Sequence, residues 1–172
     1  KIIYADPPWS YNRKVGEWIA DEEYKTMELD KIKSFLNDKN IKINDNAVLF
    51  LWVTYPLLKE GLEVMEAWGF DYKTCGFCWV KLNKNGTPFF GIGKYTKTNT
   101  ELCLLGIKGK GLDILSDKVS QLIITKKEKH SKKPFEVHDK IIELYGNYKE
   151  KIELFAREKY KDWNTYGDEI LK

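Results

Sequence analysis

The sequence predicts an α/β protein with a mostly parallel central sheet covered by helices on both faces. Short apolar runs typical of buried strands alternate with segments of helical periodicity, a pattern that favours parallel strands joined by helices. The run AVLFLWV at 47–53 is the clearest buried strand. A chain of 172 residues, 42% hydrophobic and 32% charged, is long enough to bury a core, so we expect one domain over residues 1–172.

The first predicted strand, residues 1–5, ends at Pro7 and Pro8, because proline cannot donate a hydrogen bond to a neighbouring strand. A helix is expected from Thr54 and Pro56, which are typical of a helix start, to Gly69, which is typical of a helix end. The other expected elements are a long loop at 10–26, a helix at 29–35, strands at 72–80 and 100–107 around a loop at 83–98, a turn-rich connection at 108–118, a strand at 119–125, a helix at 134–145 and a strand at 151–156.

Composition and cysteine content narrow the class of protein. The net charge of +3 permits a polyanionic partner without requiring one. Three cysteines, without a signal segment, favour a reducing compartment and a cytoplasmic location. Cys75 and Cys78 form a lone CxxC in a strand-like run, where residues three apart point to opposite faces, so we expect no metal and no redox chemistry there. No apolar stretch approaches the ~20 residues of a membrane span.

The four residues DPPW at 6–9 carry the clearest chemical signal. Asp6 is expected at the carboxyl end of a strand, where open α/β sheets bind ligands. The Asp6 carboxylate, the Pro7 carbonyl and the Trp9 ring offer two acceptors and a stacking face, which suits a planar amine such as that of adenine. Taken alone, these four residues are equally typical of a strand-ending turn with a core tryptophan.

Further motifs follow in a fixed order along the chain: ADPPW (5–9), EEYKTM (22–27), LFLWVT (49–54), FCWVK (77–81), NTELCLLGIKG (99–109), HSKKP (130–134), IELFAR (152–157) and WNTYGDE (163–169). This series resembles the MT-A70 family of adenine-N6 methyltransferases over nearly the whole chain. The resemblance implies a Rossmann-like methyltransferase fold and S-adenosylmethionine as methyl donor. It also implies a permuted motif order, with DPPW ahead of the cofactor motif.

The resemblance also implies roles for individual residues. Asp6, Pro7, Pro8 and Trp9 would form the catalytic motif, with Tyr24 beside Trp9 in the base pocket. The cofactor would be bound by a larger set, in which Lys133 neutralises its carboxylate and Asp168 departs from the family's usual asparagine: Asp6, Ser131, Lys133, Phe155, Arg157, Asp168 and Glu169.

Other assignments stay open at the level of sequence. Lys94 and Lys97 supply positive charge for a nucleic-acid backbone. Lys133 is also compatible with a solvated lysine cluster at 126–133, and Arg157 with an ion pair to a neighbouring glutamate. Glu101, a charged residue in an apolar strand, indicates a buried polar role near the site that the sequence does not specify.

The expected function is transfer of a methyl group from S-adenosylmethionine to the N6 amine of adenine in DNA. The preference for DNA rests on the similarity of small, lysine-rich, free-standing members to those of bacteria and phages, which would work in the bacterial or infected cytoplasm. The alternatives are an RNA adenine methyltransferase, a catalytically silent nucleic-acid-binding subunit, and a glutamine methyltransferase, which Asp6 disfavours because those relatives carry asparagine there. The oligomeric state is left open.

Overall fold

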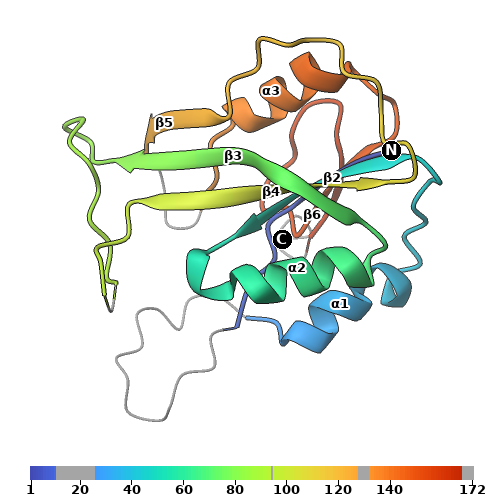
Figure 1. Cartoon of the computed structure of the whole chain (residues 1–172), viewed down its shortest axis with the longest axis horizontal. Coiled ribbons are helices and arrows are strands. Elements are labelled where there is room, and N and C mark those ends of the chain that lie inside the picture. Colours follow the sequence, from blue (N-terminus) through green and yellow to red (C-terminus); the bar gives the residue numbers. More distant parts are fainter. Residues whose placement is uncertain (11–25, 94, 128–131, 168–172) are drawn as a thin grey trace.

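The computed structural model describes residues 1–10, 26–93, 95–127 and 132–167. Within them a seven-stranded sheet has the order β5-β3-β4-β2-β1-β6-β7 (Figure 1). The strands are β1 (Ile2–Ala5), β2 (Ala47–Val53), β3 (Asp71–Leu82), β4 (Thr100–Lys108), β5 (Leu122–Lys126), β6 (Lys151–Leu154) and β7 (Asn164–Tyr166). The helices are α1 (Leu29–Asp38), α2 (Leu58–Ala67) and α3 (Glu136–Tyr145), with a 3-10 turn η1 (Tyr55–Leu57) before α2.

The sheet is mostly parallel, as the sequence predicts. Strand β1 pairs in parallel with β2 and β6, β6 with β7, and β3 with β5. Strand β4 runs antiparallel to both of its neighbours, β2 and β3. The carboxyl ends of all the parallel strands therefore meet at one edge of the sheet, together with the amino end of β4.

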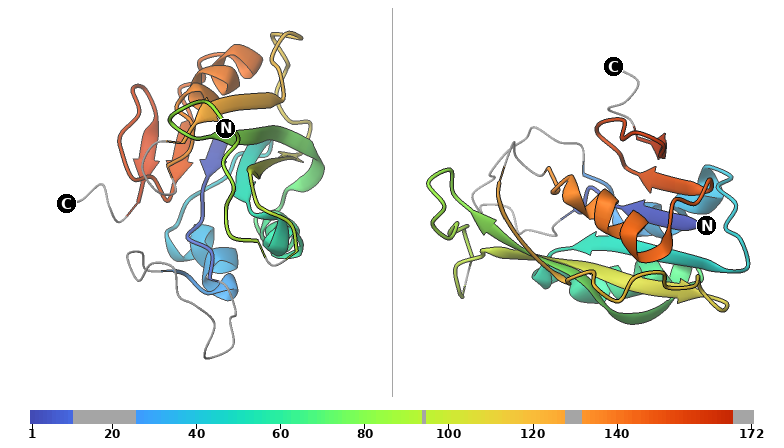
Figure 2. Two further views of the ribbon diagram at one scale, coloured as in Figure 1. Left: turned by 90° about the vertical axis from the view of Figure 1, so that its left-hand side faces the viewer. Right: turned by 90° about the horizontal axis from the view of Figure 1, so that it is seen from above.

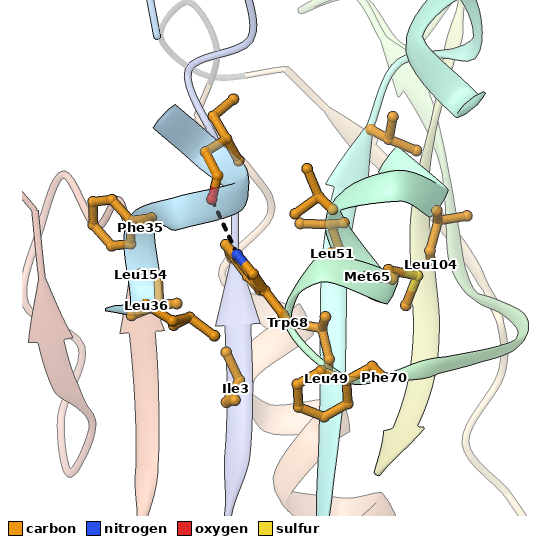
Figure 3. Close-up of a cluster of buried hydrophobic side chains, with 14 of the residues drawn as sticks. Ile3, Phe35, Leu36, Leu49, Leu51, Met65, Trp68, Phe70, Leu104 and Leu154 are labelled. Atoms are coloured by element: carbon orange, nitrogen blue, oxygen red, sulfur yellow. Dashed lines mark hydrogen bonds between the residues drawn. The ribbon is translucent and has the colours of Figure 1, made fainter. Parts of the chain in front are cut away.

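Helices cover both faces of the sheet, which confirms the predicted layers (Figures 1 and 2). On one face, α1 and α2 pack over Ile3 and Leu49, and the Trp68 indole N–H donates to the Ile32 carbonyl at 3.0 Å (Figure 3). On the other face, α3 packs over alternate residues of the same strands, including Tyr4. No helix in the described part of the chain is long and apolar enough to cross a membrane.

Two element predictions need correction at the sheet edges. Strand β5 begins at Leu122 and not at Val119. Strand β7 is absent from the prediction because its three residues are exposed or half-buried and carry no apolar alternation. It forms because β6 presents an edge to which Asn164–Tyr166 can pair in parallel.

The predicted geometry of the CxxC segment is wrong. A register shift between Cys75 and Phe77 leaves Gly76 without a partner on β4, which is a bulge. The extra residue places Cys75 opposite Leu104 and Cys78 opposite Leu102, so both thiols lie on the α2 face of β3. A Cβ on Gly76 would lie 3.1 Å from the Phe50 ring, which explains the glycine at this crowded position.

Candidate active site

The chain leaves β1 at the carboxyl edge of the sheet through a turn that its backbone holds tightly. The Trp9 N–H donates to the Pro7 carbonyl at 2.9 Å, and the Met27 N–H donates to the Pro8 carbonyl at 2.7 Å. The Trp9 indole N–H donates to the Trp52 carbonyl at the end of β2, at 3.0 Å. The half-buried Trp9 ring is therefore fixed across the ends of two strands, and the Pro7 carbonyl keeps one acceptor position.

Four side chains of alternating charge form a row behind this turn, which we call the charged row: Asp6, Lys133, Glu101 and Lys81. Lys133 Nζ lies 2.8 Å from Asp6 Oδ2 and 3.4 Å from Glu101 Oε2. The other carboxylate oxygen of Glu101 accepts a hydrogen bond from Lys81. The four side chains are between 13% and 20% exposed, so water screens these contacts only weakly.

Two tryptophans form the floor beneath the two lysines. Lys133 Nζ lies 5.6 Å from the ring centroid of Trp52, and Lys81 Nζ lies 5.0 Å from that of Trp79, within the range of cation–π attraction. The indole N–H groups are bonded in turn, that of Trp52 to the Tyr4 hydroxyl at 2.8 Å and that of Trp79 to a β5 threonine. Both rings are thereby held in place under the charged row.

Burial and neighbouring opposite charges shift the pKa values of the charged row in opposite directions. Burial raises the pKa of Asp6 above its ordinary value, and the Lys133 ammonium offsets part of that shift. Burial alone would raise the pKa of Glu101, but Lys133 and Lys81 outweigh it and lower that pKa. Burial alone would lower the pKa of Lys133, but the Asp6 and Glu101 carboxylates outweigh it and raise that pKa. Glu101 and Lys133 are therefore charged at neutral pH.

The arrangement offers complementary charge to a polar ligand at the sheet edge, with Asp6 and the Pro7 carbonyl as acceptors and Lys133 as a cation. The MT-A70 family model matches residues 1–169 of the chain. The chain belongs to the MT-A70 family.

Relatives of this MT-A70 protein carry two kinds of name. A Type II methyltransferase, M.MunI of Mycoplasma sp, is 33% identical over 189 residues, covering 99% of the chain and 77% of that protein. The N(6)-adenosine-methyltransferase subunit METTL3 of Danio rerio is 29% identical, and the human catalytic subunit METTL3 is 28% identical. Each of these two alignments covers 98% of the chain but 28% of the relative, so the chain spans only about a quarter of those longer proteins.

The structure places some of the residues predicted for the cofactor site. Lys133 lies beside Asp6 and not in a solvated cluster. The positive charge of Arg157 opposes the rise in the pKa of Asp6, although less than the Lys133 ammonium does. Phe155, which has a positive φ of 60° directly after β6, packs its ring 4.2 Å from Phe35 of α1. Its described contact is thus with the core.

The remaining predicted positions are either exposed or outside the described residues. Lys97 lies exposed in the segment between β3 and β4. The residues outside the described part of the chain are Tyr24, Lys94, Ser131, Asp168 and Glu169. Their assigned roles stay predictions.

Sequence reasoning left Glu101 without a role and did not single out Lys81. Both stand near strand ends at the carboxyl edge, and the register places Glu101 opposite Trp79. The available signal was the charge of Glu101 in an otherwise apolar strand. This signal indicated a buried charge but did not show which residue pairs with it. Among the described residues, no three His, Cys, Asp or Glu side chains come together as metal ligands.

Proposed function

We propose that this protein transfers a methyl group from S-adenosylmethionine to the N6 amine of adenine in DNA. The observation that carries the proposal is the pairing of Asp6 with Lys133 beside the Pro7 carbonyl, at the carboxyl edge of an MT-A70 sheet. The names of the relatives, a Type II methyltransferase and N(6)-adenosine methyltransferases, support the same reaction.

Asp6 and Pro7 prepare the amine for transfer. The lone pair of the adenine amine is delocalised into the ring, so the nitrogen is a poor nucleophile. Acceptance of its two hydrogens by the Asp6 carboxylate and the Pro7 carbonyl favours a pyramidal nitrogen with a free lone pair. The Asp6 charge then stabilises the positive charge that grows on the nitrogen during transfer. Trp9, anchored by the Trp52 carbonyl, offers its ring to the base.

The charged row fits the amino-acid end of S-adenosylmethionine. That end carries one carboxylate and one ammonium group, and Lys133 and Asp6 are the matching cation and anion. When bound, the cofactor supplies an activated methyl group on a sulfonium, so the protein needs to align the reacting atoms and not to form a covalent intermediate. The positive charge of Arg157 also acts on Asp6, although burial keeps the Asp6 pKa above its ordinary value.

We prefer DNA as the substrate because the chain aligns with a larger share of the Type II methyltransferase than of the adenosine methyltransferases. The alignment covers 77% of the Type II methyltransferase, whereas it covers 28% of each of the two adenosine methyltransferases. RNA remains the alternative substrate. A catalytically silent subunit is disfavoured because Asp6, Pro7, Lys133 and Arg157 are all present.

The deciding experiment is tritium transfer from labelled S-adenosylmethionine to DNA and RNA oligomers, run in parallel with the full chain. We expect label in DNA, recovered as N6-methyladenine after digestion to nucleosides. Label confined to RNA would select the RNA alternative. Absence of transfer to both polymers, from folded protein, would contradict the proposal.

A further inference from the structure

Asp6, the acceptor on which the proposed reaction depends, already has a partner. Lys133 Nζ lies 2.8 Å from Asp6 Oδ2, a distance typical of a charge-assisted hydrogen bond. Such bonds are about twice as strong as those between neutral groups, so a neutral adenine amine competes poorly with this ammonium. Lys133 therefore has to release this oxygen before Asp6 can serve the amine fully.

Glu101 supplies a second partner that can keep Lys133 in the site. Its Oε2 lies 3.4 Å from Lys133 Nζ, and its Oε1 is bonded to Lys81 on the neighbouring strand. The Glu101 backbone is paired with Trp79 in the β3–β4 ladder, so the carboxylate stands on a rigid element. A lysine that leaves Asp6 thus stays next to a fixed negative charge and above the Trp52 ring.

We propose that Lys133 masks Asp6 in the empty protein, and that Glu101, anchored by Lys81, is the positioning residue that retains Lys133 when the cofactor's carboxylate draws it from Asp6. The inference rests on the proposed function and adds an order to it, with the cofactor bound before the base. Two carboxylates and two ammonium groups leave the charged row neutral when empty. Once Lys133 turns to the cofactor's carboxylate, Oδ2 is released, and the two oxygens of Asp6 can accept from the cofactor's ammonium and from the adenine amine.

This exchange couples the two ligands. A cofactor that unmasks Asp6 raises the affinity for the base, and by linkage the base raises the affinity for the cofactor by the same factor. The contribution of the adenine base to binding can be measured with two oligonucleotides that differ at one position. One carries an unpaired adenine there, and the other carries an abasic site. The ratio of their dissociation constants reports the adenine and not the backbone.

The first test is Lys133→Met, measured without cofactor. Loss of a positive charge ordinarily weakens nucleic-acid binding, but unmasking Asp6 is expected to raise the preference for adenine over the abasic site severalfold. The matched control is Lys132→Met, because Lys132 lies next in the chain and pairs with Glu158 at 3.1 Å, outside the charged row. An unchanged or reduced preference in Lys133→Met would overturn the proposal.

The second test is Glu101→Gln, with S-adenosylhomocysteine as the probe in calorimetry. Loss of one charge-assisted contact is expected to weaken binding of the probe about tenfold. Among the described residues, the charged groups that contact Lys133 are Asp6 from the end of β1 and Glu101 from β4. Lys81 pairs in turn with Glu101, and the positive charge of Arg157 acts on Asp6. The loss should be specific to the amino-acid end of the probe, so the affinity for 5′-methylthioadenosine, which lacks that end, should not change.

The control for this variant is Glu63→Gln, which removes an acid that pairs with Lys33 at 3.1 Å between α1 and α2. It should leave the affinity for both ligands unchanged. A loss of affinity in Glu101→Gln that is absent, or that is equal for both ligands, would overturn the role of Glu101. Lys81→Met, which removes the anchor and keeps both carboxylates, should weaken binding of the probe in smaller measure and serves if Glu101→Gln does not fold. Methyl transfer by the parent is measured separately, so failure of the masking leaves the proposed function standing.

Discussion

The middle of the sheet and its carboxyl edge use the same strands for opposite purposes. Strand β2 is buried at all seven positions, and its residues pack into a core on each face. Figure 3 shows the core on the face covered by α1 and α2, with Leu49 and Leu51 of β2. Asp6 follows directly after the buried end of β1 and is the first member of the charged row. The side chains of this row are partly exposed to solvent. The middle contributes stability through apolar burial, whereas the edge holds charges whose burial costs stability and prepares a site.

The largest effect is expected in the middle of the sheet. Phe50→Ala removes a fully buried ring that stacks 5.5 Å from the Phe77 ring, and should lower the free energy of unfolding by about 3–5 kcal/mol. Denaturant unfolding followed by tryptophan fluorescence measures the loss. Tyr72→Ala, on the exposed part of β3, is the control and should cost far less. Equal losses would contradict the division between middle and surface.

At the edge, Asp6→Ala should lower the rate of methyl transfer by roughly 100-fold to 1000-fold, because it removes an acceptor from the transition state. The free energy of unfolding should fall little, since the side chain is not part of either apolar core. Single-turnover transfer and denaturant unfolding, made on the same sample, separate the two effects. Near-parental turnover would remove Asp6 from the mechanism.

Trp9→Phe tests the link between the two regions, because the Trp9 indole joins the edge to the end of β2. The variant keeps a ring but loses the hydrogen bond to the Trp52 carbonyl, so stability should fall by about 1 kcal/mol. The KM for the oligonucleotide should rise as the ring loses its fixed orientation. A variant with parental stability and KM would show that the anchor contributes nothing.

The smallest effect is expected in the pH dependence of stability. The pKa of Asp6 is higher in the folded protein than its ordinary value of 3.8, because burial disfavours the charged form. Its contribution to stability is therefore complete below pH 3.8 and is lost as the pH rises through the pKa of the folded state. Asp6→Asn has no such loss, so it should become more stable than the parent as the pH rises, while differing least at the acid end.

Thermal unfolding from pH 3 to pH 8 measures the difference between the parent and Asp6→Asn. Glu101 has a lowered pKa and loses its stabilising effect as the pH falls, but it is present in both proteins and largely cancels in the difference. If the stability of the parent relative to Asp6→Asn increased with rising pH, the pKa of Asp6 would be lowered and not raised in the folded protein.

Local sequence patterns alone predicted the elements whose residues are apolar in an unbroken run or end at a proline. The run 47–53 is apolar throughout because β2 is covered on both faces, and Pro7 and Pro8 end β1 wherever its neighbours lie. The order of the motifs was enough to place the chain in its family. For the site, local pattern singled out Asp6, the family resemblance added Lys133 and Arg157, and Glu101 was left unassigned.

Tertiary structure decided whatever depends on the neighbours of a strand. The reversal of β4, the addition of Asn164–Tyr166 as β7 and the bulge at Gly76 follow from pairing, which leaves little trace in the periodicity of one segment. The charged row depends on pairing most of all, because it joins positions 6, 81, 101 and 133 from separate segments. Periodicity along the chain records which residues are buried, whereas the partners of a buried charge are set by the order and direction of the strands.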